Sequence, residues 1–331
     1  MGNKIAQTGP GTAPEEGIER LHKPVMLEEC LAFLEPARGG VFVDATVGPG
    51  GHARAIGEAL GNKGALFGID LDPDALAIAG ENLAGLQCDW HLMRGNYVDM
   101  SGLLAAFGVQ RIDGVLFDFG PSSLDLDQAE KGFSFRLEGP LDMRYDPQAT
   151  TTARDLVNGL PEHELARIFW EYGDEIEARR IARAIERQRA QHPFNTTVEL
   201  AEFVARLKRR TRSRIHPATR VFQALRIATN DELSNVERGL ETALTLLAPG
   251  ARLVAISYHS GEHRLLKWFL RKNSGVCVCP PEVLRCECGA RDSLSVLTKR
   301  GVSPSFRETR ENPRARSAKL RAAQRRDGDA N

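Results

Sequence analysis

The sequence predicts an α/β protein in which a parallel sheet is interrupted by a block of helices. Short apolar runs, three of which end in an acid, alternate with helical segments as far as residue 118. No convincing strand pattern occurs from residue 125 to 217, and a strong apolar run returns at 252–257. Strands and helices that alternate at this spacing form βαβ units and therefore a parallel sheet.

The elements follow from these patterns in chain order. Apolar runs predict strands at 41–44, 65–70, 90–93, 114–118 and 252–257, and weaker patterns predict strands at 294–298 and 315–320. Helices are expected at 53–60, from Pro73 onward, at 165–170, 176–189, 198–208 and 218–247, and after Glu262. We therefore expect a sheet domain formed by 22–124 and 218–326, a helical insertion at 125–217, and tails at 1–21 and 327–331.

Composition excludes several classes of protein. Hydrophobic residues make up 42% and charged residues 27% of the 331 residues, which is typical of a soluble globular protein. The first 20 residues lack the basic start and apolar stretch of a signal peptide, and no apolar run is long enough to cross a bilayer. We expect a cytoplasmic protein with a disordered N-terminal tail and no membrane partner.

Net charge is zero, but basic residues gather in two clusters. The first cluster consists of Arg206, Lys208, Arg209, Arg210, Arg212 and Arg214. The second consists of Arg314, Arg316, Lys319, Arg321, Arg325 and Arg326. A charge run by itself usually forms a solvated face. Each cluster becomes a candidate for phosphate binding only if other evidence places it near a site.

A glycine loop follows the first predicted strand. Gly48-Pro-Gly-Gly-His-Ala fits the pattern G-x-G-x-x-A, which both NAD and S-adenosylmethionine sites use, and Asp70 at the end of the next strand is suited to bind a ribose. Asp44 lies four residues before Gly48. An acid, small residues and then a glycine loop are typical of class I methyltransferases, so this spacing favours a methyltransferase over an NAD-dependent dehydrogenase.

Asp118 is the third acid at the end of a predicted strand, and it begins Asp-Phe-Gly-Pro-Ser-Ser. Ligands of open α/β sheets bind outside the carboxyl ends of the strands. The amino group of a nucleobase is a poor nucleophile, and a carboxylate that accepts its hydrogens restores electron density and aligns its lone pair. Asp118 is therefore a candidate catalytic residue. The alternative is a strand-end Asp that caps the next turn.

Several further motifs have no generic structural reason to exist. They are His-Lys-Pro-Val-Met-Leu (22–27), Gly-Phe-Ser-Phe (132–135), Gly-Pro-Leu-Asp-Met-Arg (139–144), His-Pro-Ala-Thr-Arg (216–220), Phe-Gln-Ala-Leu-Arg-Ile (222–227), Asn-Asp-Glu-Leu (230–233), Ser-Tyr-His-Ser (257–260) and Glu-Asn-Pro-Arg-Ala-Arg-Ser (311–317). From about residue 22 to 326 the chain resembles the bacterial family of 16S rRNA cytosine-N4 methyltransferases (RsmH, formerly MraW).

This resemblance implies a class I (Rossmann-like) methyltransferase sheet with an inserted all-helical domain. It implies methylation of N4 of a cytosine in the decoding region of 16S rRNA, with S-adenosylmethionine as cofactor. The implied cofactor residues are Gly50, Gly51, His52, Asp70, Tyr97, Asp118 and Asp125, and the glycine-loop pattern adds Gly48. Ser122 and His259 join Asp118 as catalytic candidates, while a polar lining that braces the loop is an equal interpretation of His259.

The chain departs from the family pattern at three places. The family commonly has glutamine where this chain has Asp125, Leu-Glu-Asp-Arg where it has Gly-Glu-His-Arg (261–264), and valine where it has Pro121. These departures leave the class intact. They concern the contacts around the methionine carboxylate of the cofactor and around the target base.

The expected partner is 16S rRNA, within the small ribosomal subunit or an assembly intermediate. The insertion at 125–217 becomes a candidate RNA-recognition domain, and the cluster at 206–214 becomes a candidate for holding RNA phosphates. Methylation of another RNA base, an NAD-dependent dehydrogenase and a non-catalytic RNA-binding protein remain alternatives. The oligomeric state is open, with a dimer as one possibility.

Four of the six cysteines lie close together: Cys277, Cys279, Cys286 and Cys288. Four thiolates can form a tetrahedral zinc site, although the usual spacing is C-x2-C rather than C-x-C. A structural zinc is therefore one interpretation of this segment. Free thiols or a labile disulfide are the alternative.

Overall fold

A seven-stranded sheet forms the larger part of the molecule. The computed structural model describes residues 24–208, 215–283 and 285–327. The strands are β1 (Gly40–Asp44), β2 (Gly64–Asp70), β3 (Asp89–Arg94), β4 (Ile112–Asp118), β5 (Leu247–Ser257), β6 (Leu294–Val296) and β7 (Lys319–Arg325). Their order is β3-β2-β1-β4-β5-β7-β6, with only β7 antiparallel to its neighbours. The prediction of an α/β fold built on a parallel sheet is confirmed.

Helices cover both faces of this sheet. One face carries α1 (Leu27–Leu34), α2 (Gly51–Leu60) and α3 (Pro73–Leu83), and the other carries α4 (Met100–Ala105), α11 (Glu232–Leu246) and α12 (Ser260–Lys272). Successive strand residues point to opposite faces, so Val43 packs in one hydrophobic cluster and Phe42 in the other. Burial on both faces explains why the strands are nearly continuous apolar runs.

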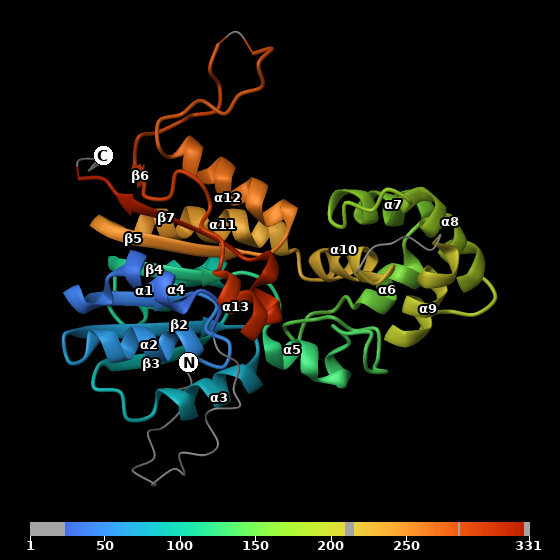
Figure 1. Cartoon of the computed structure of the whole chain (residues 1–331), viewed down its shortest axis with the longest axis horizontal. Coiled ribbons are helices and arrows are strands. Elements are labelled where there is room, and N and C mark those ends of the chain that lie inside the picture. The colour runs from blue at the N-terminus through green and yellow to red at the C-terminus, as the bar shows by residue number, and fades with distance from the viewer. Residues whose placement is uncertain (1–23, 209–214, 284, 328–331) are drawn as a thin grey trace.

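The helical insertion forms a separate part of the molecule (Figure 1). It contains α5 (Ser123–Asp127), α6 (Ala153–Gly159), α7 (Glu162–Glu171), α8 (Ala178–Arg189), α9 (Thr197–Leu207) and α10 (Thr219–Thr229). These helices enclose a hydrophobic cluster that includes Phe169, Ile181 and Leu200. Val221 and Leu225 of α10 belong to the same cluster, so α10 packs with the helices of the insertion. The expected domain boundary at residue 217 places this helix with the sheet domain instead.

The helix expected over 218–247 is two helices. The helix is interrupted at Asn230 and Asp231, and Asp231 has φ 48°. The Asn230 side chain accepts a hydrogen bond from Tyr145 N at 2.9 Å and donates one to Met143 O at 2.7 Å. These contacts come from residues more than 80 positions away, and they fix the break.

The strand expected at 315–320 is also misplaced. Residues Pro313–Ser317 form the short helix η5, and β7 starts only at Lys319. The remaining short helices are η2 (Pro36–Arg38), η3 (Tyr97–Asp99), η4 (Ala129–Lys131) and α13 (Phe306–Glu311). Among the helices that the structure describes, none has the length and apolar character needed to cross a membrane.

Candidate active site

A cavity of about 440 Å³ lies at the carboxyl ends of the strands, between the sheet and the insertion. Its walls come from the loops after the five strands β1 to β5, from α10 and α11, and from the segment around η5. Most of the candidate residues line it: Gly48, Gly51, His52, Asp70, Tyr97, Asp118, Ser122, Asp125 and His259. Gly50 does not line it, because Gly50 is buried against Ala79 of α3.

The glycine loop joins β1 to α2 and forms one wall of the cavity. Gly48 has φ 50° and Gly50 has φ 89°, a conformation that favours glycine. A Cβ added to Gly48 would meet only Ser122 within 4 Å, so the bare backbone leaves space on the cavity side. A ligand can therefore approach the loop backbone closely.

Asp70 joins this loop to β2. Its Oδ2 accepts a hydrogen bond from Gly48 N at 2.8 Å, and its Oδ1 accepts one from Asp72 N at 3.0 Å. Burial raises the pKa of Asp70 to about 6. Each carboxylate oxygen can accept a second hydrogen bond, so Asp70 retains the capacity to bind the hydroxyls of a ribose.

Asp118 lies at the end of β4, between two partners. The Tyr258 hydroxyl donates to Asp118 Oδ1 at 2.6 Å, and His52 Nδ1 lies 3.8 Å from Asp118 Oδ2. His52 Nε2 is 2.9 Å from Val25 O; since a carbonyl only accepts, Nε2 carries a proton. Burial raises the pKa of Asp118, although His52 and the Tyr258 hydroxyl both act to lower it.

Thr46 hydrogen-bonds the backbone of Asp118, and Asp44 in turn hydrogen-bonds the backbone of Thr46. Thr46 Oγ1 accepts a hydrogen bond from Asp118 N at 2.7 Å. Asp44 Oδ1 accepts one from Thr46 N at 3.2 Å, while Asp44 Oδ2 is buried without a hydrogen-bond partner. Burial raises the pKa of Asp44 to about 7. The acid that begins the glycine motif therefore shapes the site without lining the cavity.

Ser122 has a structural role at the start of α5. Its hydroxyl accepts a hydrogen bond from Asp125 N at 3.1 Å, and its N–H donates to Asp125 Oδ2 at 2.8 Å, which together form a capping box. The hydroxyl also donates to Asp125 Oδ2 at 2.7 Å. Lys131 binds Asp125 Oδ1 at 3.0 Å and also contacts the carboxylate of Asp72. The Ser122 hydroxyl is thus engaged in the helix cap while Ser122 lines the cavity, and its catalytic role stays a prediction. The Asp125 charge is balanced by Lys131.

A group of buried ionisable residues closes the cavity on the side of α11 and α12. Arg226 donates to both carboxylate oxygens of Glu232, at 2.8 and 2.9 Å. His259 Nε2 lies 3.1 Å from Glu262 Oε1, and Tyr258 N donates to Glu262 Oε2 at 2.7 Å. Burial tends to raise the pKa of Glu262, but His259 and Arg226 outweigh it and lower that pKa.

Glu232, His259 and Glu262 are close enough to share a metal ion. The guanidinium of Arg226 already occupies both oxygens of Glu232 and supplies the positive charge that a cation would otherwise bring. A satisfied ion pair therefore explains this group.

Sequence reasoning did not identify some of the residues that line the cavity. Arg226, Glu232, Asn235 and Glu262 do so, and Arg314 reaches it from η5, with its Nη2 3.1 Å from Asp127 Oδ2. Most of them fall within or beside motifs noted in the sequence. No spacing rule connects them, because the chain brings them together only through tertiary folding.

The first basic cluster is only partly available for RNA. Arg206 is exposed, with 70% of its side chain accessible. Lys208 is not available: its Nζ binds Glu175 Oε2 at 2.6 Å and Pro217 O at 3.2 Å, and Glu175 is fully buried. The remaining members, Arg209, Arg210, Arg212 and Arg214, lie outside the described residues.

A family model described as the MraW methylase family matches residues 19–326. The chain belongs to this family. It is 48% identical over 316 residues to ribosomal RNA small subunit methyltransferase H of Thermomicrobium roseum, a match that covers 95% of this chain and 96% of that protein. It is 51% identical over 305 residues to the protein of the same name from Geobacter sulfurreducens, covering 92% and 98%.

Solved structures add little to this assignment. A putative rRNA-methylase from Clostridium thermocellum superposes on 92% of this chain and 100% of that chain, with a TM-score of 0.42 and 12% identity. Membership of the MraW methylase family rests instead on the sequence match over nearly the whole chain. It shows that the chain is an S-adenosylmethionine-dependent methyltransferase and removes the dehydrogenase alternative.

Proposed function

We propose that this chain transfers a methyl group from S-adenosylmethionine to the N4 amino group of a cytosine in the decoding region of 16S rRNA. The observation that carries the proposal is the position of Asp118, which lines the same cavity as the glycine loop and Tyr258. The names of the relatives support ribosomal RNA of the small subunit as the substrate class. An enzyme with this substrate acts in the cytoplasm.

The cavity fits S-adenosylmethionine by its charge and its hydrogen-bond acceptors. The cofactor supplies a methyl group on a positively charged sulfur, and it carries ribose hydroxyls that donate hydrogen bonds. Asp70 can accept from the hydroxyls, and Asp118 offers negative charge to the cationic part. Six acids line the cavity: Asp70, Asp72, Asp118, Asp125, Glu232 and Glu262. Lys131 pairs with Asp72 and Asp125, and Arg226 pairs with Glu232. Asp70 and Asp118 are therefore the carboxylates that we assign to the cationic cofactor and its ribose.

Asp118 is positioned to activate the amino group of the base. Tyr258 already donates to its Oδ1, so Oδ2 has the greater remaining capacity to accept an N–H from the substrate. Accepting that hydrogen bond increases electron density on nitrogen and aligns its lone pair with the methyl group. The proton that the nitrogen then loses passes to the Asp118 carboxylate or to water. Tyr258 holds the carboxylate in place throughout.

Residues around the cavity rim are candidates to hold the RNA. A base must leave its stack to reach a buried amino-group site, so the backbone must be gripped while the base enters. Among the described residues, we assign this role to Arg314, which lines the cavity at η5, and to exposed Arg206 on α9, which is outside the cavity lining. The ring of His259, which lines the cavity beside Glu262, is a candidate to contact the base.

The test is a transfer experiment with labelled S-adenosylmethionine, purified protein, and either assembled small subunits or free 16S rRNA. We expect label in RNA only with protein present, and nucleoside mass spectrometry should identify N4-methylcytidine. Label in a different nucleoside would show that the enzyme is an RNA methyltransferase with another target base. Absence of label in every RNA, with cofactor binding intact, would contradict catalysis on rRNA. Comparing the two substrates decides at which stage of assembly the enzyme acts.

A further inference from the structure

The segment between α12 and β6 projects from the body of the protein as a long loop (Figure 1). Its two limbs are joined at the base: Gly275 N donates to Arg291 O at 2.9 Å, and Arg291 N donates to Lys272 O at 2.9 Å. Beyond that base, none of the described residues from 276 to 291 belongs to the hydrophobic core. Val276 and Val283 are 42% and 38% exposed. Apolar packing therefore does not hold the outer part of the loop together.

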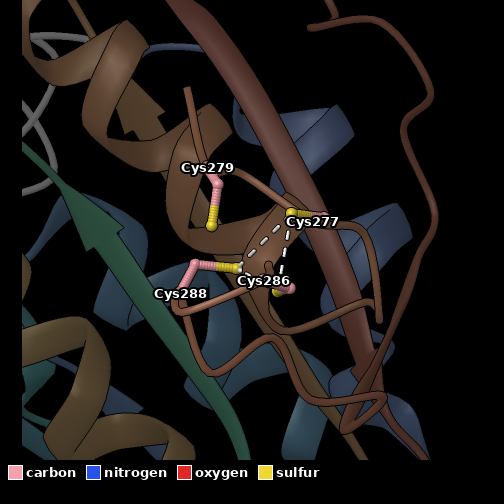
Figure 2. A group of neighbouring side chains, drawn as sticks. All are labelled: Cys277, Cys279, Cys286 and Cys288. Carbon is pink, nitrogen blue, oxygen red and sulfur yellow. Dashed lines mark hydrogen bonds between the residues drawn. The ribbon is translucent and has the colours of Figure 1, made fainter. Parts of the chain in front are cut away.

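Four cysteines meet inside this loop (Figure 2). Cys277 Sγ lies 3.5 Å from Cys286 Sγ and 3.9 Å from Cys288 Sγ, and Cys286 Sγ lies 3.5 Å from Cys288 Sγ. The four sulfurs, including that of Cys279, lie within 4.8 Å of one another. All four cysteines are free thiols.

These separations match a tetrahedral metal site. Zinc binds thiolate sulfur at about 2.3 Å, which places the sulfurs at the corners of a tetrahedron with edges of about 3.8 Å. The short C-x-C spacing does not prevent convergence, because the chain bends at Cys279 and Cys288 and brings both sulfurs of the second pair to the same side.

Backbone N–H groups support the sulfurs. Val278, between the cysteines of the first pair, donates its N–H to Cys288 Sγ at 3.5 Å. Glu287, between the cysteines of the second pair, donates its N–H to Cys279 Sγ at 3.4 Å. Each pair thus contributes a donor to a sulfur of the other pair. Hydrogen bonds of this kind stabilise the negative charge of metal-bound thiolates.

We propose that Cys277, Cys279, Cys286 and Cys288 bind one structural Zn²⁺ that holds the projecting loop in a defined conformation. Binding releases the four thiol protons to solvent. Four protein ligands complete the tetrahedron and leave no open position, as in structural rather than catalytic zinc sites. The loop has no hydrophobic core of its own, and a metal is one of the means by which such small units are stabilised.

The first test measures metal content in the full-length protein, purified under reducing conditions without added chelator. We expect one zinc per chain by plasma mass spectrometry. Cys277→Ser combined with Cys286→Ser should abolish zinc binding, whereas Cys88→Ala, which removes a buried cysteine elsewhere, should retain it. Replacement by cobalt should give the thiolate charge-transfer and d–d absorption of a tetrahedral sulfur site.

A second measurement addresses the loop itself and does not depend on how the serine variant folds. Removing the metal from wild-type protein with a chelator should expose the loop at residues 275–291 to proteolysis while the sheet domain stays protected, and added zinc should reverse this. Zinc-free reduced protein with an equally protected loop would overturn the proposal. So would iron at the site, native disulfides between these cysteines, or unchanged zinc in the double serine variant.

Discussion

The hydrogen bond between Tyr258 and Asp118 gives a sharp test of how the site is tuned. Tyr258→Phe removes only the hydroxyl that donates to Asp118 Oδ1 at 2.6 Å and keeps the aromatic ring. That hydroxyl lowers the pKa of Asp118, while burial raises it. Losing the hydroxyl therefore raises the pKa of Asp118 further. At a given pH, a smaller fraction of the enzyme then carries the carboxylate that accepts from the substrate amino group.

The size of the effect follows from the nature of this bond. A hydrogen bond to a charged group contributes about 1.5–3 kcal/mol, and short O–H to carboxylate bonds belong to the strong class. At about 1.4 kcal/mol for each factor of ten, the methyl-transfer rate on the acid side of the pH profile should fall roughly 10- to 100-fold. The loss should shrink as the pH rises, because Asp118 then ionises in the variant as well.

The assay is the single-turnover rate of methyl transfer across a pH series, with saturating cofactor and small ribosomal subunits. Tyr172→Phe is the matched control, since Tyr172 packs against the helical cluster and does not line the cavity. We expect the acid limb of the Tyr258→Phe profile to move to higher pH, and the control to overlay wild type. A Tyr258→Phe profile that overlays wild type would refute the claim that Tyr258 tunes Asp118.

Three further predictions concern charges. Lys208→Ala should lower the free energy of unfolding in urea by about 3–5 kcal/mol, because it leaves the buried carboxylate of Glu175 unpaired. Arg206→Ala should change that free energy by less than about 0.5 kcal/mol and lower the salt slope of RNA binding by about 1. Equal effects of the two variants would contradict this distinction. Arg226→Met should cost a similar amount, about 3–5 kcal/mol in urea unfolding, because it leaves the Glu232 charge buried and unpaired, and adding Glu232→Leu should recover most of that loss. A double variant as unstable as Arg226→Met alone would contradict this explanation. Asp44 has a folded-state pKa of about 7 against 3.8, so its folded form keeps a proton that its unfolded form loses, and stability falls as pH rises between these values. Between pH 5 and about 7 this titration costs about 1.4 kcal/mol of unfolding free energy per pH unit. Asp44→Asn should therefore reduce the loss of stability from pH 5 to pH 8 by about 2–3 kcal/mol. An unchanged loss in the variant would show that another group causes it.

The sequence predicted the sheet well because its signals are local. The runs before Asp44, Asp70 and Asp118 are apolar and short, and each ends at the edge where ligands bind. The same pattern located the glycine loop and three acids of the site. Residues on strand ends are predictable because strand direction fixes where they lie.

Other features depend on contacts that no local pattern contains. The segment 313–325 alternates small and basic residues, so its helical turn and its strand could not be separated by periodicity; pairing with β5 fixes the strand. Lys208 looked like part of a solvated basic run, but Glu175 binds it from 33 positions away. The pairing of Arg226 with Glu232 across a helix break was equally hidden, because that break is set by Met143 and Tyr145.

The central claim is that Asp118 activates the substrate amino group. Single-turnover rates for Asp118→Ala and Asp118→Asn, with saturating cofactor and small subunits, test it most directly. The alanine variant should lose about 2–4 kcal/mol of transition-state stabilisation, a rate decrease of roughly 30- to 1,000-fold. The asparagine variant keeps one acceptor and should retain an intermediate rate. A folded Asp118→Ala protein that binds cofactor and transfers methyl groups at the wild-type rate would contradict the claim.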